Sequence, residues 1–501
     1  MRISPYTWLA LFAALLLTAC GEQFLDLKPR GTDLESGYYQ TEEELFEALV
    51  ATYDVLQWGG TNGWTMPLGL LNAASDDCYA GGSDASDQPS WVAMDAFTLD
   101  PFLGPQLGLW QKGYTGIYRA NLVLQKLEEA PATVDAAFKE RAAAEARFLR
   151  AYFYFDLVRL FGQIPLITTV LSGDELYTQV QTTPQAIYAQ IESDLEAARS
   201  SFLLPETLPA DELGRVTRGA VSALLGKVIL YQNDEARMAE AAARFEEVIG
   251  AGIYALEPNY GDIFAEDHEF GPESVFEISY SANQRGGWGN FGNGTEGNYN
   301  VQFFGMRDYV GPRYAGGYGF CPVTEKLAAA LAGDPRREHT LIDGAALKAS
   351  GASYSAGYQN TDYFIRKYAG LIATRALDGE PALNWSNNIR EIRLADVLLM
   401  AAEAHARAGN APVALDYLNR VRSRVGLPDR TGLSGSALLD AIYTERQLEL
   451  ATEGHRFFDL VRTGRAAQEL TGFVVGKNEY LPIPQSEIDV TEGLLVQNPN
   501  Y

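Results

Sequence analysis

This chain of 501 residues has few cysteines, few histidines and a deficit of positive charge. Its three cysteines and four scattered histidines do not provide the clustered ligand spacings of structural metal sites, so neither a metal nor another cofactor is expected. Lysine and arginine number 39 against 65 acidic residues, and the net charge of −26 would repel a polyanion. The composition therefore argues against a nucleic-acid partner.

The sequence also lacks an apolar run long enough to span a membrane. The run Tyr6–Leu17 has about a dozen residues, whereas a spanning helix needs roughly 20. It follows a positive charge at Arg2 and leads through the small residues Thr18 and Ala19 to Cys20. This order is typical of an export signal, which we place at residues 1–19.

The cysteine that follows Leu-Thr-Ala resembles the lipobox of bacterial lipoproteins, in which the thiol receives fatty acyl chains such as palmitate. An ordinary signal peptide that ends near a cysteine is the alternative. Because two or three acyl chains hold a protein firmly at a bilayer, we expect lipidation of Cys20 to be the only membrane attachment. The other two cysteines, Cys78 and Cys321, stand about 240 positions apart, and an oxidising exterior permits but does not establish a disulfide between them.

Three segments have the spacing of helices with a buried face. Residues 142–162 place apolar side chains at helical intervals and stop at Gly162, while residues 223–249 and 395–426 each indicate a helix pair. Small residues such as Gly226 recur where two helices must approach closely. These pairs resemble tetratricopeptide repeats, so we predict a mainly all-α fold in which tetratricopeptide-like helix pairs form a superhelical scaffold.

Between residues 251 and 390 the helical pattern gives way to Gly, Asn, Pro and Tyr, with one strand-like run at Ser274–Tyr280. A stretch this long and this aromatic is typical of a functional lobe and not of a linker. We expect one domain over residues 20–501. Its parts are a helical scaffold at about 35–250 and 391–465, a loop-rich ligand-binding lobe at about 251–390 and a docking segment at 466–501.

Long sequence blocks in a fixed order, from the N-terminal region to the last residue, carry a family resemblance. The blocks are FLDLKPRG (Phe24–Gly31), IYRANLVLQKL (Ile117–Leu127), EARFLRAYFYFDLVRLFGQIPLI (Glu145–Ile167), RVTRGAVSALLGKVILY (Arg215–Tyr231), IREIRLADVLLMAAEA (Ile389–Ala404), YLNRVRSRVGL (Tyr417–Leu427), ERQLELATEGHRFFDLVRTG (Glu445–Gly464), and YLPIPQSEIDV with LLVQNPNY within Tyr480–Tyr501. The chain resembles the SusD/RagB family of outer-membrane nutrient-binding lipoproteins.

The resemblance implies a non-catalytic receptor that is lipid-anchored at the bacterial outer membrane and exposed on the cell surface. It also implies a partner, a SusC-like TonB-dependent transporter, to which the receptor delivers captured oligosaccharides. Some members of the family capture peptides, so a peptide receptor is the first alternative, and a lipid-anchored glycosidase is the second.

Three glutamates could be mistaken for catalytic carboxylates. Glu445, Glu449 and Glu453 stand at i, i+4 and i+8, with Arg446 and Arg456 nearby. This spacing places the glutamates on one helix face within reach of arginines, which indicates a charge network that fixes helix packing. Glycoside hydrolysis needs two carboxylates on opposite sides of a cleft. We therefore expect no enzyme activity.

The segment Asn283–Asn300 is the best ligand-binding candidate, because it interleaves aromatic residues with Asn, Gln and Arg in a glycine-rich backbone. Aromatic faces stack on the C–H faces of sugars, while amides and guanidinium groups bind the hydroxyls. A structural loop pinned by its own aromatic rings is the alternative. The residues expected to bind ligand here are Trp288, Tyr299, Phe291 and Arg285.

A second candidate is Asn72–Trp91, with Trp64 just upstream. The family resemblance implies that a stacking aromatic residue and polar partners come from a loop at about this place. The residues expected to bind ligand here are Trp91, Asp76, Asp77 and Asn72. The two aspartates could equally be helix caps or turn residues.

Overall fold

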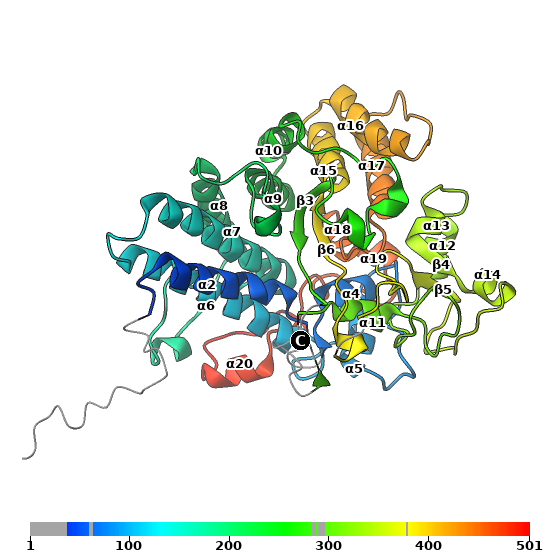
Figure 1. Cartoon of the computed structure of the whole chain (residues 1–501), viewed down its shortest axis with the longest axis horizontal. Coiled ribbons are helices and arrows are strands. Elements are labelled where there is room, and N and C mark those ends of the chain that lie inside the picture. The colour runs from blue at the N-terminus through cyan, green and yellow to red at the C-terminus, as the bar shows by residue number, and fades with distance from the viewer. Residues whose placement is uncertain (1–37, 60–63, 283–286, 289–295, 377–378) are drawn as a thin grey trace, which may run out of the picture.

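A computed structural model describes residues 38–59, 64–282, 287–288, 296–376 and 379–501 (Figure 1). The long helices follow one another in an arc from α2 and α6 on the left, over α9 and α10, to α15, α16 and α17 at the top right. Neighbours in this order pack against each other, and α10 bridges to α15 across the intervening lobe sequence. These helices are α2 (Glu42–Asp54), α6 (Gln106–Glu129), α7 (Ala136–Phe161), α8 (Pro184–Ser200), α9 (Arg218–Tyr231), α10 (Met238–Gly250), α15 (Leu394–Arg407), α16 (Ala411–Arg424) and α17 (Gly435–Leu450).

Shorter elements fill the space under the arc and build the lobe on the right. The short helices are α4 (Pro67–Ala73), α5 (Pro89–Asp95), α11 (Tyr299–Phe304), α12 (Glu325–Ala330), α13 (Arg337–Thr340), α14 (Gly344–Ala349), α18 (Arg456–Arg462), α19 (Ala466–Glu469) and α20 (Gln485–Val490). The strands are β1 (Ile164–Pro165), β2 (Gln181–Thr182), β3 (Ser274–Ile278), β4 (Leu341–Asp343), β5 (Tyr363–Ile365) and β6 (Ile389–Arg393), and they pair antiparallel as β1–β2, β3–β6 and β4–β5.

The predicted helix pairs are present. The side chain of Asp135 caps the N-terminus of α7, and Gly162, with φ of 71°, ends it where the sequence predicted a stop. In the α9–α10 pair, a Cβ built on Gly226 would lie 2.6 Å from the ring of Phe245, so only glycine allows this approach. The mainly helical fold with packed helix pairs is confirmed.

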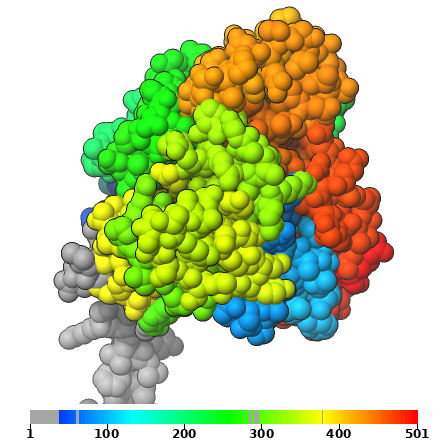
Figure 2. Space-filling view, turned by 90° about the vertical axis from the view of Figure 1, so that its right-hand side faces the viewer, coloured from blue at the N-terminus to red at the C-terminus, as the bar shows by residue number. Residues whose placement is uncertain are grey.

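The segment before α15 is a strand, which the sequence did not predict. In β6, Ile389 pairs with Ile278 of β3 and Arg393 pairs with Ser274, so the beginning and the end of the lobe lie side by side. Figure 2 shows the lobe in yellow-green, with the α15–α17 region in orange above it. In the described ranges no helix is both long and apolar enough to cross a bilayer.

The last residues of the chain return to α7. The backbone N–H of Leu481 donates to the carbonyl of Leu160 at 2.7 Å, and the Asn498 amide donates to the carbonyl of Phe161 at 2.9 Å. These bonds satisfy carbonyl groups that the end of a helix leaves without partners. The C-terminal segment therefore completes the end of α7.

Candidate functional site

Five aromatic side chains form a continuous ladder from the surface to the core. The exposed end is Trp288, with 51% of its surface accessible, and its ring meets Trp64 edge-on at 6.2 Å between centroids. Trp64 contacts Tyr299 at 6.0 Å and Phe303 at 5.0 Å, and Phe303 stacks on Trp91 at 5.5 Å. We call these five residues the aromatic ladder. Because its inner members are packed in the core, the ladder holds one indole at the surface on a rigid base.

Tyr318 and Gln302 are half-buried residues that continue from the inner part of the ladder. Tyr318 packs edge-on against Phe303 at 5.5 Å, and its backbone N–H donates to the carbonyl of Gln302. The phenol of Tyr318 can offer a hydroxyl and a ring face to a sugar, whereas the Gln302 amide is held inside the protein, donating to the carbonyl of Gly316 at 3.3 Å and accepting from the indole N–H of Trp385 at 3.4 Å. The aromatic composition of residues 307–320 was a signal for Tyr318, whereas Gln302 lies in the short helix α11 and had none.

The residues of Asn283–Asn300 that were predicted to bind ligand differ in how exposed they are to solvent. Trp288 is exposed as a ligand contact requires, whereas Tyr299 is only 4% exposed and supports Trp64 from below. Arg285 and Phe291 lie outside the described residues. The direct stacking role expected of Tyr299 is therefore corrected to a supporting one.

The four residues predicted from the second loop make contacts inside the protein, and their expected ligand-binding roles are corrected. Trp91 is fully buried, and its indole N–H donates to the carbonyl of Trp64 at 3.1 Å. The Asn72 side chain donates to the carbonyl of Thr452 at 2.9 Å and accepts from the N–H of Gly454 at 3.0 Å. These contacts join residues nearly 400 positions apart, so the loop serves to fasten α4 to the segment before α18.

The two aspartates of that loop have opposite electrostatic surroundings. Burial opposes ionisation of Asp76, but Arg456 at 2.7 Å and Lys326 at 2.8 Å hold the pKa of its carboxyl below the usual value. Burial and the charge of Asp76 raise the pKa of Asp77 to about 6, although its carboxylate accepts the N–H of Thr452 at 3.1 Å. Both carboxylates act in packing.

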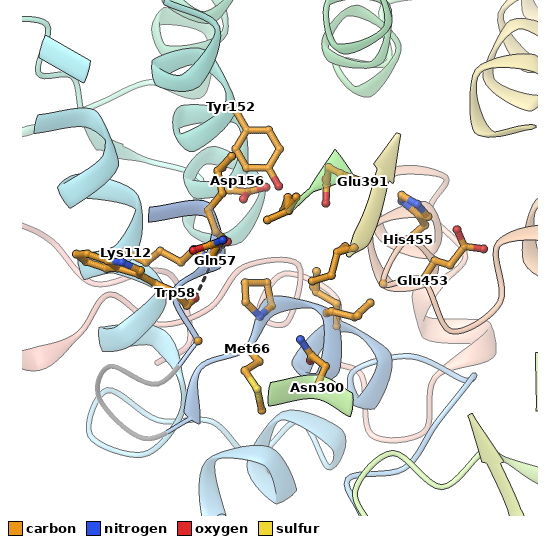
Figure 3. A pocket seen from close by; sticks show the side chains of 18 of the residues that line it. Gln57, Trp58, Met66, Lys112, Tyr152, Asp156, Asn300, Glu391, Glu453 and His455 are labelled. Atoms are coloured by element: carbon orange, nitrogen blue, oxygen red, sulfur yellow. Dashed lines mark hydrogen bonds between the residues drawn. The ribbon is translucent and has the colours of Figure 1, made fainter. Parts of the chain in front are cut away.

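A cavity of about 70 Å³ lies where α7, β6 and the lobe come together (Figure 3). Tyr299 belongs to its wall as well as to the ladder, and Asn300 points into it from below. Tyr152 and Asp156 enter from α7, and Glu391 enters from β6. A polar cavity of this size holds several water molecules. The cavity has room for water at the place where side chains of the scaffold and of the lobe meet.

Titratable groups face one another across this cavity. Lys112 donates to the carbonyls of Leu56 and Trp58, each at 2.9 Å, and burial lowers its pKa to about 8. Burial and the nearby Lys227 lower the pKa of His455 to about 4, so its imidazole is neutral at pH 7. Burial raises the pKa of Glu391 to about 7, against the opposing effects of Lys227 and of the Arg159 guanidinium.

Glu391 makes the stability of the protein depend on pH. Its carboxyl keeps its proton in the folded state up to about pH 7, whereas in the unfolded chain it ionises near its ordinary value of 4.5. The wild type therefore loses stability as the pH rises between these values. Glutamine does not titrate. We therefore expect the free energy of unfolding of Glu391→Gln, measured relative to that of wild type, to be about 2 kcal/mol higher at pH 8 than at pH 5. Urea unfolding at the two pH values measures this difference, and an equal effect at both would contradict it.

Comparison with known proteins identifies the family. A family model described as the SusD family matches residues 344–501, and one described as starch-binding, associating with the outer membrane, matches residues 71–230. The solved structure of a laminarin binding SusD-like protein matches with a TM-score of 0.86 and 42% identity, covering 92% of this chain and 100% of that one. The chain belongs to the SusD family. A second SusD-family structure, surface glycan-binding protein A from Bacteroides thetaiotaomicron in complex with laminarihexaose, matches with a TM-score of 0.83 and 32% identity, covering 92% of this chain and 100% of that one.

Curated relatives agree with this assignment. A SusD-like protein of Formosa agariphila is 26% identical over 95% of this chain and 94% of its own length. The starch-binding protein SusD of Bacteroides thetaiotaomicron is 25% identical over 72% of this chain and 73% of its own length. The SusD family consists of non-catalytic glycan-binding proteins associated with the outer membrane, so the chain is not an enzyme.

The three glutamates of the SusD-family block form a charge network in the core. Glu445 pairs with Arg422 at 2.6 Å and Glu449 with Arg393 at 2.7 Å, while the third member, Glu453, also pairs with Arg393, at 2.8 Å. The prediction that these glutamates act in helix packing is correct. The arginines that pair with them, however, come from other elements than the helix that carries Glu445 and Glu449. The third glutamate also lies beyond the end of α17 at Leu450.

Cys78 and Cys321 are buried free thiols on adjacent backbone segments of this SusD-family chain. Cys78 forms an antiparallel bridge with Val323, and the N–H of Cys321 donates to the carbonyl of Ala80 at 3.1 Å. Burial and the hydrogen bond to Cys321 raise the pKa of the Cys78 thiol well above its usual value. The Cys78 thiol is therefore unreactive in this state.

Proposed function

We propose that the protein is a lipid-anchored cell-surface receptor that captures laminarin-type oligosaccharides and passes them to a TonB-dependent transporter of the outer membrane. The observation that carries the proposal is the exposed indole of Trp288 at the head of the aromatic ladder. An indole face offers a flat apolar surface to a sugar ring, and the rigid packing beneath it lowers the entropy cost of binding. The choice of laminarin-type glycans rests on the two SusD-family structures whose descriptions name laminarin and laminarihexaose.

The mode of attachment follows from the sequence. Cys20 lies outside the described residues, and its lipobox-like surroundings support acylation there. Two or three acyl chains are enough for stable attachment to the outer membrane. We propose that the anchored protein is oriented with the exposed end of the aromatic ladder facing the extracellular space, where glycans are bound.

Delivery to a transporter requires a broad and rigid docking surface. Stacked helix pairs provide such surfaces, and stable protein interfaces bury well over 1,000 Å² in total. The partner we propose is a SusC-like TonB-dependent transporter. Its presence in complexes isolated from native membranes in mild detergent supports delivery, and a monodisperse monomer from the same membranes counts against it.

Calorimetry with glycans of increasing length tests capture. We expect laminari-oligosaccharides of two to six units to bind with rising affinity, because each shallow contact adds little and several must act together. Maltohexaose and cellohexaose are matched controls of equal length and different linkage, and we expect them to bind more weakly. Binding of peptides in place of all glycans would reject the proposal, as would release of shortened products from the bound glycan.

A further inference from the structure

The loop between α10 and β3 brings together three side chains of a kind that bind metals. One donor atom each from Glu257, Asp262 and His268 lies within 4.8 Å of the other two. The carboxylate Oε2 of Glu257 is 3.6 Å from Nδ1 of His268, which is too far for a hydrogen bond. We infer that these three residues form a binding site for a divalent transition-metal ion, and that zinc is the ion best matched to it.

The isolation of Glu257 is the main argument for a bound cation. This residue is 9% exposed, and in the described part of the chain its carboxylate has no hydrogen bond and no lysine or arginine within ion-pair distance; its one facing partner is the His268 imidazole at 3.6 Å, which carries a charge only when protonated. Other buried glutamates nearby are paired, as Glu273 is with Arg393 at 2.6 Å and Arg424 at 3.2 Å. Burying a carboxylate without a compensating charge is unfavourable, and a bound cation would remove that cost.

The backbone around the three residues is held in place without a metal. The N–H of Glu257 donates to Oε2 of Glu273 at 2.8 Å, which ties the loop to the buried charge network. The N–H of His268 donates to the carbonyl of Ala265 at 3.1 Å, and the His268 carbonyl accepts from Gly271 at 3.2 Å. Asp262 ends the 3₁₀ helix Tyr260–Asp262. The donors therefore come from preorganised positions, which lowers the entropy cost of binding an ion.

The donor set selects the kind of ion. Two carboxylates and one imidazole provide two oxygens and one nitrogen, and the two negative charges match a divalent cation. Calcium and magnesium prefer oxygen ligands alone, whereas imidazole suits zinc and its neighbours in the first transition row. The His268 side chain is 38% exposed, so water can reach the ion and complete its coordination. Such an ion would join the 3₁₀ helices Tyr260–Asp262 and Glu266–His268 to Glu257.

Zinc titration of the tag-free, chelator-treated mature chain tests the inference. We expect calorimetry to show one zinc ion per chain, and Glu257→Gln and His268→Gln each to weaken binding at least tenfold. Asp267→Asn is the matched control, because Asp267 is exposed and lies on the same 3₁₀ helix as His268. We expect it to leave zinc binding unchanged. Zinc should also raise the melting temperature of wild type and of the control, but not of the two ligand variants.

Two results would overturn the inference. The first is the absence of zinc binding by wild type, and the second is equal binding by wild type and the Glu257→Gln, His268→Gln double variant. Circular dichroism establishes that each variant is folded. If Glu257→Gln fails to fold, His268→Gln decides the question, since its side chain is more exposed. Cobalt substitution gives an independent readout, because its visible absorption reports nitrogen and oxygen ligands directly and should disappear with His268→Gln.

Discussion

Replacing Arg393 with methionine should lower the free energy of unfolding by about 3–5 kcal/mol. The guanidinium is 1% exposed and donates to Glu273 at 2.6 Å, to Glu449 at 2.7 Å and to Glu453 at 2.8 and 2.9 Å. Methionine fills much of the same volume but leaves the three carboxylates with less positive charge in the core. Truncating one partner of a buried ion pair lowers the free energy of unfolding, because the remaining charge is out of contact with water and has lost its opposite charge. Urea unfolding followed by tryptophan fluorescence measures the loss.

A surface arginine provides the control for this effect. Arg237 pairs with Glu192 at 2.7 Å, but the two side chains are 26% and 22% exposed. Water screens such a pair, so Arg237→Met should cost no more than about 1 kcal/mol. A similar small loss for Arg393→Met would mean that the network contributes little to stability.

Replacing Trp288 with alanine should weaken glycan binding by roughly 1–3 kcal/mol, which is about 5- to 150-fold in affinity. The indole is the exposed end of the aromatic ladder, so its removal takes away the stacking surface and leaves the ladder beneath it in place. The melting temperature should change little, because half of the side chain is already exposed. Calorimetry with laminarihexaose gives the affinity, and thermal unfolding gives the stability.

An exposed aromatic ring elsewhere provides the matched control. Phe202 is 86% exposed and lies just after α8, away from the ladder, so Phe202→Ala should change neither affinity nor stability. An unchanged affinity in Trp288→Ala would assign the ladder to loop packing alone. A large fall in its melting temperature would show that the indole supports the fold more than the ligand.

The helical scaffold could be predicted because its signals are local. Helical spacing in α7, the stop at Gly162 and the small Gly226 between α9 and α10 are all determined by neighbours in sequence or in one helix pair. The strand β6 was missed because its partner β3 lies more than 100 residues earlier, and no local pattern reveals that pairing.

The candidate site was predictable only in part. A loop rich in glycine and aspartate looked exposed, yet Trp91 is buried because Phe303 stacks on it from another segment. Asp76 was expected to bind ligand or to cap a helix or turn, but its carboxylate pairs with Arg456, 380 positions away in the sequence. Burial and distant ion pairing are properties of the folded chain, so composition was right only in placing Trp288 at the surface, and it misassigned these two residues.

The β3–β6 pair has a consequence for how this protein can vary in evolution. Ile278 and Ile389 are directly paired across the two strands, so the chain leaves the scaffold and re-enters it at adjacent points. A segment whose two ends are neighbours can lengthen, shorten or be exchanged at a modest entropy cost, without displacing the helices on either side. Residues 279–388 are therefore an insertion that relatives can vary, but a grafted span would have to keep its buried pairs with the scaffold, such as Arg336 with Glu449 at 3.0 Å and Lys367 with Glu453 at 2.7 Å.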